Sequence, residues 1–231
     1  MKMLVSDYDN TFHIKDCDMD RNIEKVDEFR KNNLFVIATG RSYESYKTQE
    51  DLFNIKTDYL IINHGATILK DDNVIYNKSI DNNVKQQLIK DLELDKSDAF
   101  YCYKGKQSVE INENDITKML IEYKDHETAV KIRQLIKDKY INILQNFHFT
   151  TYNSVEIVSA NVDKSIAIDV ISKIEKTDNI YVIGDNHNDY LMIKKYAGSC
   201  TNVAIDKVKQ IAKKQYENVS DYIDEIIKEV I

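Results

Sequence analysis

Four short apolar segments, each stopping abruptly at polar residues, organise the chain. They lie at residues 3–7, 34–40, 59–63 and 180–185. Near-continuous apolar runs of this length are typical of strands buried on both faces of a parallel sheet. In such sheets, ligands bind beyond the carboxyl ends of the strands, which is where the polar residues follow here. We therefore expect these polar residues to gather along one edge of a sheet.

Helical patterns lie between and after these segments. Apolar side chains recur at helical spacing in residues 23–29, 166–174, 203–212 and 222–230. Alternation of strands and helices at this scale predicts an α/β fold with an open, doubly wound sheet.

Residues 81–160 follow a different pattern. Helical spacing at 84–92 and 129–136 alternates with short apolar runs at 99–103, 108–111, 119–123, 142–147 and 155–158. We interpret this stretch as an α+β module inserted between the third and fourth core strands. The core is then formed by residues 1–80 and 161–231, although no linker rich in proline or glycine marks the borders.

Composition narrows the functional classes. The chain has 231 residues, is 42% hydrophobic and carries a formal net charge of −7, which argues against a general nucleic-acid or anionic-membrane surface. Its apolar runs are far shorter than the ~20 residues needed to cross a bilayer, and no signal-peptide pattern is present at the start. We expect a cytoplasmic protein with neither a nucleic-acid nor a membrane partner, and the oligomeric state stays open.

The cysteines and histidines of this sequence show no pattern typical of a disulfide framework or a zinc site. Cys17, Cys102 and Cys200 are widely spaced and lack a Cys-x-x-Cys pair, so we expect reduced thiols. The histidines His13, His126 and His148 show no metal-ligand spacing. With only five glycines and no proline, each glycine is expected where no other residue would do, and Gly40, Gly65 and Gly184 all follow apolar runs.

Two acidic clusters follow predicted strands. Asp7 and Asp9 come after the first, and Asp185 and Asp189 after the last. An isolated Asp-x-Asp is usually an acidic turn, and Asn188 or Asp189 could serve to cap the following helix. Neither explanation accounts for Asp185. If both strand ends meet, up to four carboxylates share one crevice, and Mg²⁺ with its oxygen ligands would compensate their charge.

A third strand end adds groups suited to phosphate. Thr39-Gly40-Arg41-Ser42 offers a hydroxyl and free backbone N–H groups that can hold phosphate oxygens. Alone, this tetrapeptide would be an ordinary turn.

Taken together, these residues resemble the four motifs of the haloacid-dehalogenase-like (HAD) superfamily in order and spacing. The matching stretches are Asp7-x-Asp9-x-Thr11, Thr39-Gly40-Arg41, Lys164 and Gly184-Asp185-x-x-Asn188-Asp189. The 81–160 insertion is similar to the α+β cap of the Cof-like, type IIB (C2B) sugar-phosphatase branch. The resemblance covers essentially the whole chain and implies a Rossmann-like core with this cap.

The resemblance also implies roles for individual residues. Asp7 would be the nucleophile that forms an aspartyl-phosphate, and Asp9 would be the general acid and base. The implied substrate- or phosphate-binding residues are Thr11, Thr39, Gly40, Arg41, Lys164 and Asn188. The implied Mg²⁺ ligands are Asp7, Asp9 through its backbone carbonyl, Asp185 and Asp189.

Two stretches depart from the branch pattern. Asn63-His64-Gly65-Ala66 replaces the usual Asn-Gly-Ala, and Thr201-Asn202-Val203-Ala204 replaces the usual Gly-Asn-Ala. His64, His187 and Asn202 therefore receive no role.

The leading hypothesis is a magnesium-dependent phosphatase acting on a small phosphorylated metabolite, with sugar phosphates favoured. A phosphotransferase or phosphomutase using the same intermediate stays open, as does a non-catalytic Mg²⁺-binding regulatory module. The substrate is not identified, and the cap residues considered for its recognition are Tyr101, Tyr103, Lys104, Glu110 and Tyr123.

Overall fold

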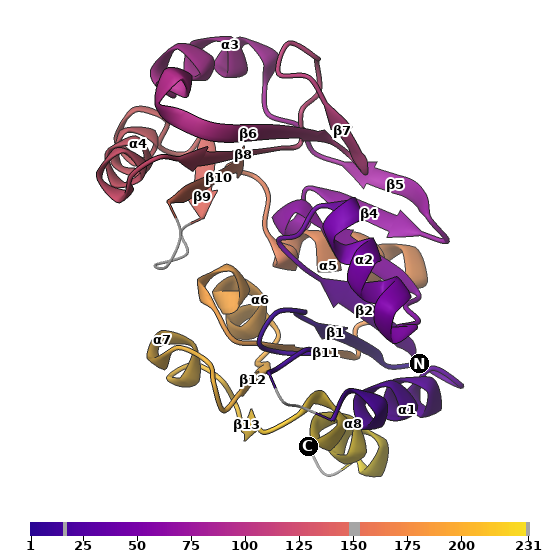
Figure 1. Ribbon diagram of the computed structural model, residues 1–231. Coiled ribbons are helices and arrows are strands. Elements are labelled where there is room, and N and C mark those ends of the chain that lie inside the picture. Colours follow the sequence, from indigo (N-terminus) through magenta and orange to yellow (C-terminus); the bar gives the residue numbers. More distant parts are fainter. Residues whose placement is uncertain (16–17, 148–152, 230–231) are drawn as a thin grey trace.

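The computed structural model describes residues 1–15, 18–147 and 153–229, which form two β-sheets and the helices that cover them. Cys17, His148 and the last position of the 222–230 segment lie outside the described residues. Figure 1 shows the larger sheet and its helices below a smaller module, which lies over one edge of the sheet.

The larger sheet has eight strands. In spatial order they are β13 (Gln215–Tyr216), β12 (Ser199–Thr201), β11 (Ile180–Gly184), β1 (Met3–Ser6), β2 (Leu34–Ala38), β3 (Tyr59–Ile62), β4 (Thr67–Lys70) and β5 (Asn73–Asn77). The first six run parallel, and β4 and β5 are antiparallel additions at one edge. The four strands predicted from the sequence are neighbours at the centre, so the predicted α/β class is confirmed.

Helices cover both faces of this sheet. One face carries α1 (Met19–Phe29), α2 (Tyr43–Phe53) and α8 (Val219–Lys228), and the other carries α5 (Lys164–Glu175), α6 (Tyr190–Lys195) and α7 (Asp206–Lys209). Successive side chains of a strand point to opposite faces. Accordingly, Leu4 packs with the first group of helices and Val5 with the second. Two buried faces explain why the central strands are apolar throughout.

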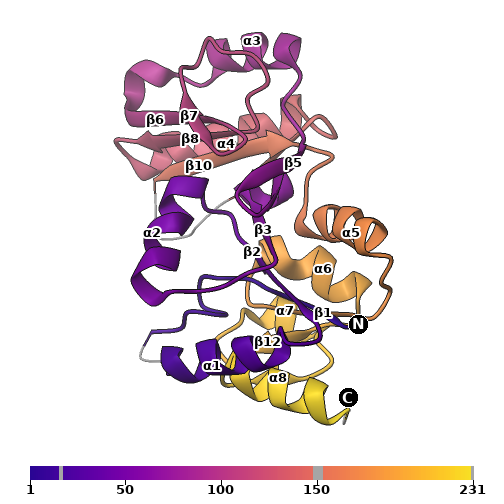
Figure 2. The same ribbon diagram turned by 90° about the vertical axis from the view of Figure 1, so that its right-hand side faces the viewer.

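The second sheet belongs to the inserted cap. Its strands, in spatial order, are β7 (Gln107–Val109), β6 (Ser97–Lys104), β8 (Lys118–Tyr123), β10 (Ser154–Ser159) and β9 (Leu144–Phe147), all antiparallel. Helices α3 (Asn82–Asp91) and α4 (His126–Lys139) share one hydrophobic cluster with this sheet. The views in Figure 1 and Figure 2 place α3 on the side away from the core. The borders at residues 81 and 160 remain a prediction.

Three single-turn helices complete the described part of the chain. They are η1 (Asn63–Gly65) after β3, η2 (Leu94–Lys96) before β6, and η3 (His187–Asp189) before α6. Two of them follow core strands at the edge that faces the cap. They therefore belong to the region where the site was expected.

Several elements differ from the sequence-based expectation. Helix α2 and strands β4, β5, β12 and β13 were not predicted, because they are short or only partly buried. The helix expected over 203–212 is reduced to α7. The backbone N–H of Ile205 donates to the Asp185 carbonyl at 3.0 Å, and Ile205 itself is extended. The helix therefore begins only at Asp206.

The described residues bear on two further expectations. Cys102 and Cys200 are buried free thiols, as expected for those two cysteines. Within the described ranges, no helix has the length and apolar character to cross a membrane.

The central strand should tolerate truncation poorly. Leu4 is fully buried in β1, so Leu4→Ala should lower the free energy of unfolding by about 2–5 kcal/mol. The same change at Leu52, which is 69% exposed on α2, should cost less than about 0.5 kcal/mol. Urea unfolding followed by circular dichroism measures both. Equal losses would contradict the buried position of β1.

Candidate active site

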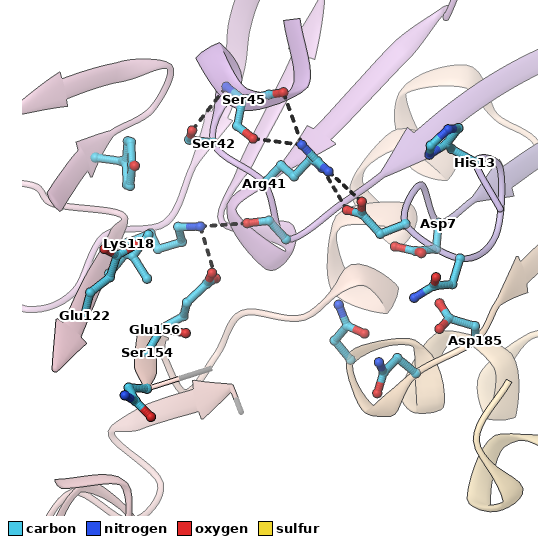
Figure 3. Close-up of a pocket in the computed structure, with 18 of the residues that line it drawn as sticks. Asp7, His13, Arg41, Ser42, Ser45, Lys118, Glu122, Ser154, Glu156 and Asp185 are labelled. Atoms are coloured by element: carbon cyan, nitrogen blue, oxygen red, sulfur yellow. Dashed lines mark hydrogen bonds and ion pairs between the residues drawn. The ribbon is translucent and has the colours of Figure 1, made fainter. Parts of the chain in front are cut away.

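The ends of three neighbouring strands bring the expected residues to one edge. Strand β1 pairs in register with both β11 and β2, so that Ser6 lies beside Ile183 and Ile37. Asp7, Asp185 and the loop starting at Thr39 follow directly. A cleft of about 950 Å³ lies between this edge and the cap sheet. In Figure 3, core side chains such as Asp7 and Asp185 face cap side chains such as Lys118 and Glu122 across it.

A buried cluster of charges forms the floor of the site. Carboxylate oxygens of Asp7, Asp185 and Asp189 lie within 4.8 Å of one another. Lys164, the first residue of α5, donates from Nζ to Asp7 Oδ1 at 2.5 Å and to Asp189 Oδ1 at 2.6 Å. All four side chains are almost completely buried. Asp7 and Asp189 lie 157 and 25 positions from Lys164 in the sequence, and the fold brings both into contact with it.

Asp189 is held mainly by its own loop. Its Oδ2 accepts hydrogen bonds from the backbone N–H groups of Asp185 and Asn186, both at 3.0 Å. Asn186 caps η3 with its side chain, and Asp189 completes a capping box by accepting from the Asn186 backbone N–H. Asp189 is also the N-cap residue of α6, where its side chain makes no cap hydrogen bond. Gly184 allows this arrangement, because a Cβ at that position would lie 2.5 Å from Cγ of Asp189. The loop thereby fixes Lys164 from one side and leaves Asp7 and Asp185 to line the cleft.

The charges in this cluster are not balanced. Burial and the neighbouring Asp189 and Asp185 raise the pKa of Asp7 well above its usual range, despite the opposing effect of Lys164. Burial and Asp189 likewise raise the pKa of Asp185 to about 7. Additional positive charge would therefore stabilise the ionised cluster. Because every candidate ligand is an oxygen, the group fits a hard divalent cation such as Mg²⁺.

Asp9 lies outside this cluster and is paired with Arg41. The guanidinium donates from Nε to Asp9 Oδ2 at 2.8 Å and from Nη2 to Asp9 Oδ1 at 2.7 Å. Arg41 also donates to Ser45 Oγ at 3.0 Å and lies over the ring of Tyr8. Asp9, whose side chain is about half exposed, lines the cleft next to Asp7. Arg41 thus holds a carboxylate here, which the phosphate-binding expectation did not include.

The remaining expected residues divide into two groups. Gly40 and Asn188 line the cleft. Thr11 and Thr39 are fully buried and do not line it. Thr11 donates to Asp185 Oδ1 at 3.1 Å, which gives its hydroxyl a different partner from the expected phosphate. Thr39 Oγ1 accepts from the backbone N–H of Arg41 at 3.1 Å.

The cap contributes residues that the sequence did not single out. Of the five candidates, Tyr103 and Tyr123 line the cleft, whereas Tyr101, Lys104 and Glu110 do not. The roof is formed largely by alternate residues of two adjacent strands, Lys118, Leu120 and Glu122 on β8 and Ser154 and Glu156 on β10. Residues 119–121 are all apolar between Lys118 and Glu122, so no alternation of polar and apolar residues marked this face in the sequence.

The three residues left without a role lie in different surroundings. His64 is buried and contacts Glu156 of the cap, with 2.5 Å between Nε2 and Oε2. His187 and Asn202 are exposed and do not line the cleft.

Comparison with known proteins agrees with this arrangement. A family model described as haloacid dehalogenase-like hydrolase matches residues 4–113 and 96–226. The chain is 27% identical to an uncharacterised Mycoplasma capricolum protein over 261 residues, covering 94% of this chain and 97% of the relative. It is 25% identical over 229 residues to a Buchnera aphidicola protein named "Putative phosphatase", covering 86% and 83%.

A solved structure from Plasmodium vivax, described as a HAD/COF-like hydrolase, has the same fold. Its TM-score is 0.80 at 22% identity, and the match covers 99% of this chain and 96% of that chain. The family model spans nearly the whole sequence, and both the core and the cap match the solved fold. The chain therefore belongs to the haloacid dehalogenase-like hydrolase family.

Proposed function

We propose that this protein is a magnesium-dependent phosphatase that hydrolyses small phosphorylated metabolites, with sugar phosphates as the first class to test. The observation that carries the proposal is the contact of Lys164 with Asp7 at the floor of a capped cleft, with Asp9 close by. The name of the Buchnera aphidicola relative supports the same reaction class.

In the first step, a carboxylate oxygen of Asp7 attacks phosphorus as the bond from phosphorus to the leaving oxygen breaks. Asp9 gives its proton to that oxygen, and Asp7 becomes an aspartyl-phosphate. Lys164 orients Asp7 and offsets negative charge at the phosphoryl group. Asp9 must leave its ion pair with Arg41 before it can carry the proton.

In the second step, water attacks the phosphorus of the aspartyl-phosphate. Asp9 takes the proton from this water, the acyl–phosphate bond breaks, and Asp7 and inorganic phosphate are released. The same group therefore serves first as acid and then as base, and the cycle returns Asp9 to its protonated state.

The acid cluster would hold Mg²⁺ through Asp7 and Asp185, with the Asp9 carbonyl as a further ligand. The cation supplies charge neutralisation for the phosphate oxygens. Thr11 would orient Asp185 through its hydrogen bond at 3.1 Å. Asp189 would act behind them, because its oxygens are engaged by Lys164 and by two backbone N–H groups.

Gly40 of the 39–41 loop and Asn188 of η3, which line the cleft, would contact the phosphate group. Thr39, which is buried, would support this loop through its hydrogen bond with the Arg41 N–H. The cap, proposed to span 81–160, would exclude water and contact the leaving group. Its roof is lined mainly by polar side chains, which suits hydroxyl-rich leaving groups such as sugars.

Substitution of the two neighbouring aspartates should separate their roles. Asp7→Asn should abolish turnover and prevent any covalent phosphoryl-enzyme. Asp9→Asn should lower turnover by about 10²–10⁴-fold, the usual worth of acid–base assistance. With an aryl phosphate, whose leaving group needs little protonation, the Asp9→Asn protein should accumulate phosphate on Asp7, measured by intact mass after acid quench.

Near-normal turnover by Asp7→Asn, or phosphate mapped to another residue, would overturn this mechanism. Inorganic phosphate released without an added acceptor distinguishes a phosphatase from a phosphotransferase. Release that depends on an added sugar would favour the transferase.

Magnesium should bind at the acid cluster. Chelation should abolish turnover, and added Mg²⁺ should restore it and raise the melting temperature, because a ligand stabilises the state that binds it. Asp185→Asn should remove the Mg²⁺-dependent rise while leaving the metal-free melting temperature unchanged or higher, since it relieves repulsion among buried carboxylates. Scanning calorimetry with and without Mg²⁺ measures both effects.

The matched control is Asp138→Asn, which removes a carboxylate from the exposed surface of α4. It should keep the full Mg²⁺ response. An unchanged response in Asp185→Asn, or full activity in chelator, would refute the metal assignment.

A further inference from the structure

A buried lysine of the cap contacts the backbone of the core. Lys118 is the first residue of β8, and its side chain is only 3% exposed. Its Nζ donates to the carbonyl oxygen of Gly40 at 2.8 Å and to Glu156 Oε2 at 3.1 Å. Figure 3 shows Lys118 extending from the cap sheet toward the core, with Glu156 beside it. Gly40 lies next to Thr39, so the lysine meets the core at the proposed phosphate loop.

Glu156 and His64 hold this lysine in place. Glu156 Oε2 also lies 2.5 Å from His64 Nε2. Burial raises the pKa of Glu156, but the neighbouring Lys118 and His64 lower it more strongly, to about 2. The group is therefore a carboxylate. A buried ammonium and a buried carboxylate are tolerated because each satisfies the other.

The same cluster fits closely around Gly40. A Cβ at Gly40 would lie only 2.3 Å from Cε1 of His64, so the imidazole lies directly against the glycine. Lys118 contacts the carbonyl of the same residue. Gly40 is thereby fixed through both its Cα and its carbonyl group. No side chain larger than hydrogen fits between the 39–41 loop and the imidazole.

The contact can act on Thr39 through one peptide group. The peptide that joins Gly40 and Arg41 accepts from Lys118 at its oxygen and donates from its N–H to Thr39 Oγ1 at 3.1 Å. A cationic donor at the oxygen polarises the peptide and strengthens the hydrogen bond made by its N–H. This hydrogen bond to the buried Thr39 fixes the peptide after Gly40, and Gly40 and Arg41 themselves line the cleft.

We propose that Lys118 is a positioning residue for phosphoryl transfer, which acts from the cap through the Gly40 carbonyl to hold the 39–41 loop in its phosphate-binding geometry. Glu156 orients the lysine, and His64 supports Glu156 from the core side. The phosphate site is then complete only when the cap lies against the core as it does here. This inference rests on the proposed phosphatase function.

The first test is Lys118→Met, which keeps the length of the side chain and removes the charge and the donor. Loss of a hydrogen bond from a charged group predicts a fall of roughly 10- to 100-fold in kcat/KM. The loss should be similar for two aryl phosphates of different size and for a sugar phosphate, because the loop binds the phosphate common to all. Calorimetry with inorganic phosphate and Mg²⁺ should show weaker binding as well.

Lys85→Met is the matched control. Lys85 is also a buried lysine of the cap, and its Nζ donates to the backbone carbonyls of Ile111 and Glu113. It does not line the cleft. Its loss should lower the melting temperature while leaving phosphate binding and kcat/KM of the folded protein unchanged.

A double variant tests whether Glu156 acts through Lys118. Glu156→Gln should lower kcat/KM in the same direction but by less. Lys118→Met/Glu156→Gln should lose no more activity than Lys118→Met alone, because the carboxylate has nothing left to orient. This double variant also removes both buried charges together, so it remains folded if the single lysine variant does not.

The inference is overturned if folded Lys118→Met binds inorganic phosphate as tightly as the parent. A loss of kcat/KM that varies with the leaving group would also overturn it, because the lysine would then contact the leaving group directly. The proposed function fails on different evidence, namely absence of turnover by the unchanged protein or full turnover by Asp7→Asn. The phosphate-binding measurement tests the role of Lys118 whether or not the protein proves to be a phosphatase.

Discussion

The buried lysine between two aspartates is the interaction on which this site depends. Lys164 donates to Asp7 and Asp189, and all three groups are almost inaccessible to water. Burial lowers the pKa of Lys164, but the neighbouring Asp189 and Asp7 raise it more strongly, so the ammonium stays charged. Isolated buried charges would be costly, and the fold accepts them only as a hydrogen-bonded group. This hydrogen-bonded group therefore fixes α5, the loop after β11 and the end of β1 relative to one another.

This group leaves the cluster with more carboxylates than cations, and that imbalance has a chemical consequence. Asp7 and Asp185 are held where their ionised forms are disfavoured, as the raised pKa of each indicates for burial beside other carboxylates. A divalent cation bound beside these carboxylates would offset their excess negative charge. The Asp9–Arg41 pair lies outside this buried cluster, and the guanidinium holds the Asp9 carboxylate through two hydrogen bonds.

The cap adds a second buried set of charges at the other wall of the cleft. Lys118 and Glu156 come from neighbouring cap strands, and they meet Gly40 and His64 of the core. Both sets place a lysine against groups that lie beside the proposed phosphate position. The difference lies in the element that carries the lysine, since Lys164 belongs to the core and Lys118 to the cap. Cap and core therefore contribute jointly to the electrostatics of one cleft.

The sequence by itself determined the α/β class, the four central strands and the acidic residues at their ends, because apolar runs and abrupt polar stops are local properties of the chain. Short strands such as β12 and the late start of α7 were not predictable, since pairing with neighbouring strands and a backbone contact with Asp185 decide them. The family resemblance predicted that Lys164 belongs to the site, but no local sequence pattern predicts its position between Asp7 and Asp189. The pairing of Arg41 with Asp9, the commitment of Thr11 to Asp185 and the contact of Lys118 with Gly40 were decided only by the tertiary structure. Each joins segments far apart in the chain, and hydrogen-bond partners at such separation depend on distances that only the packed elements fix.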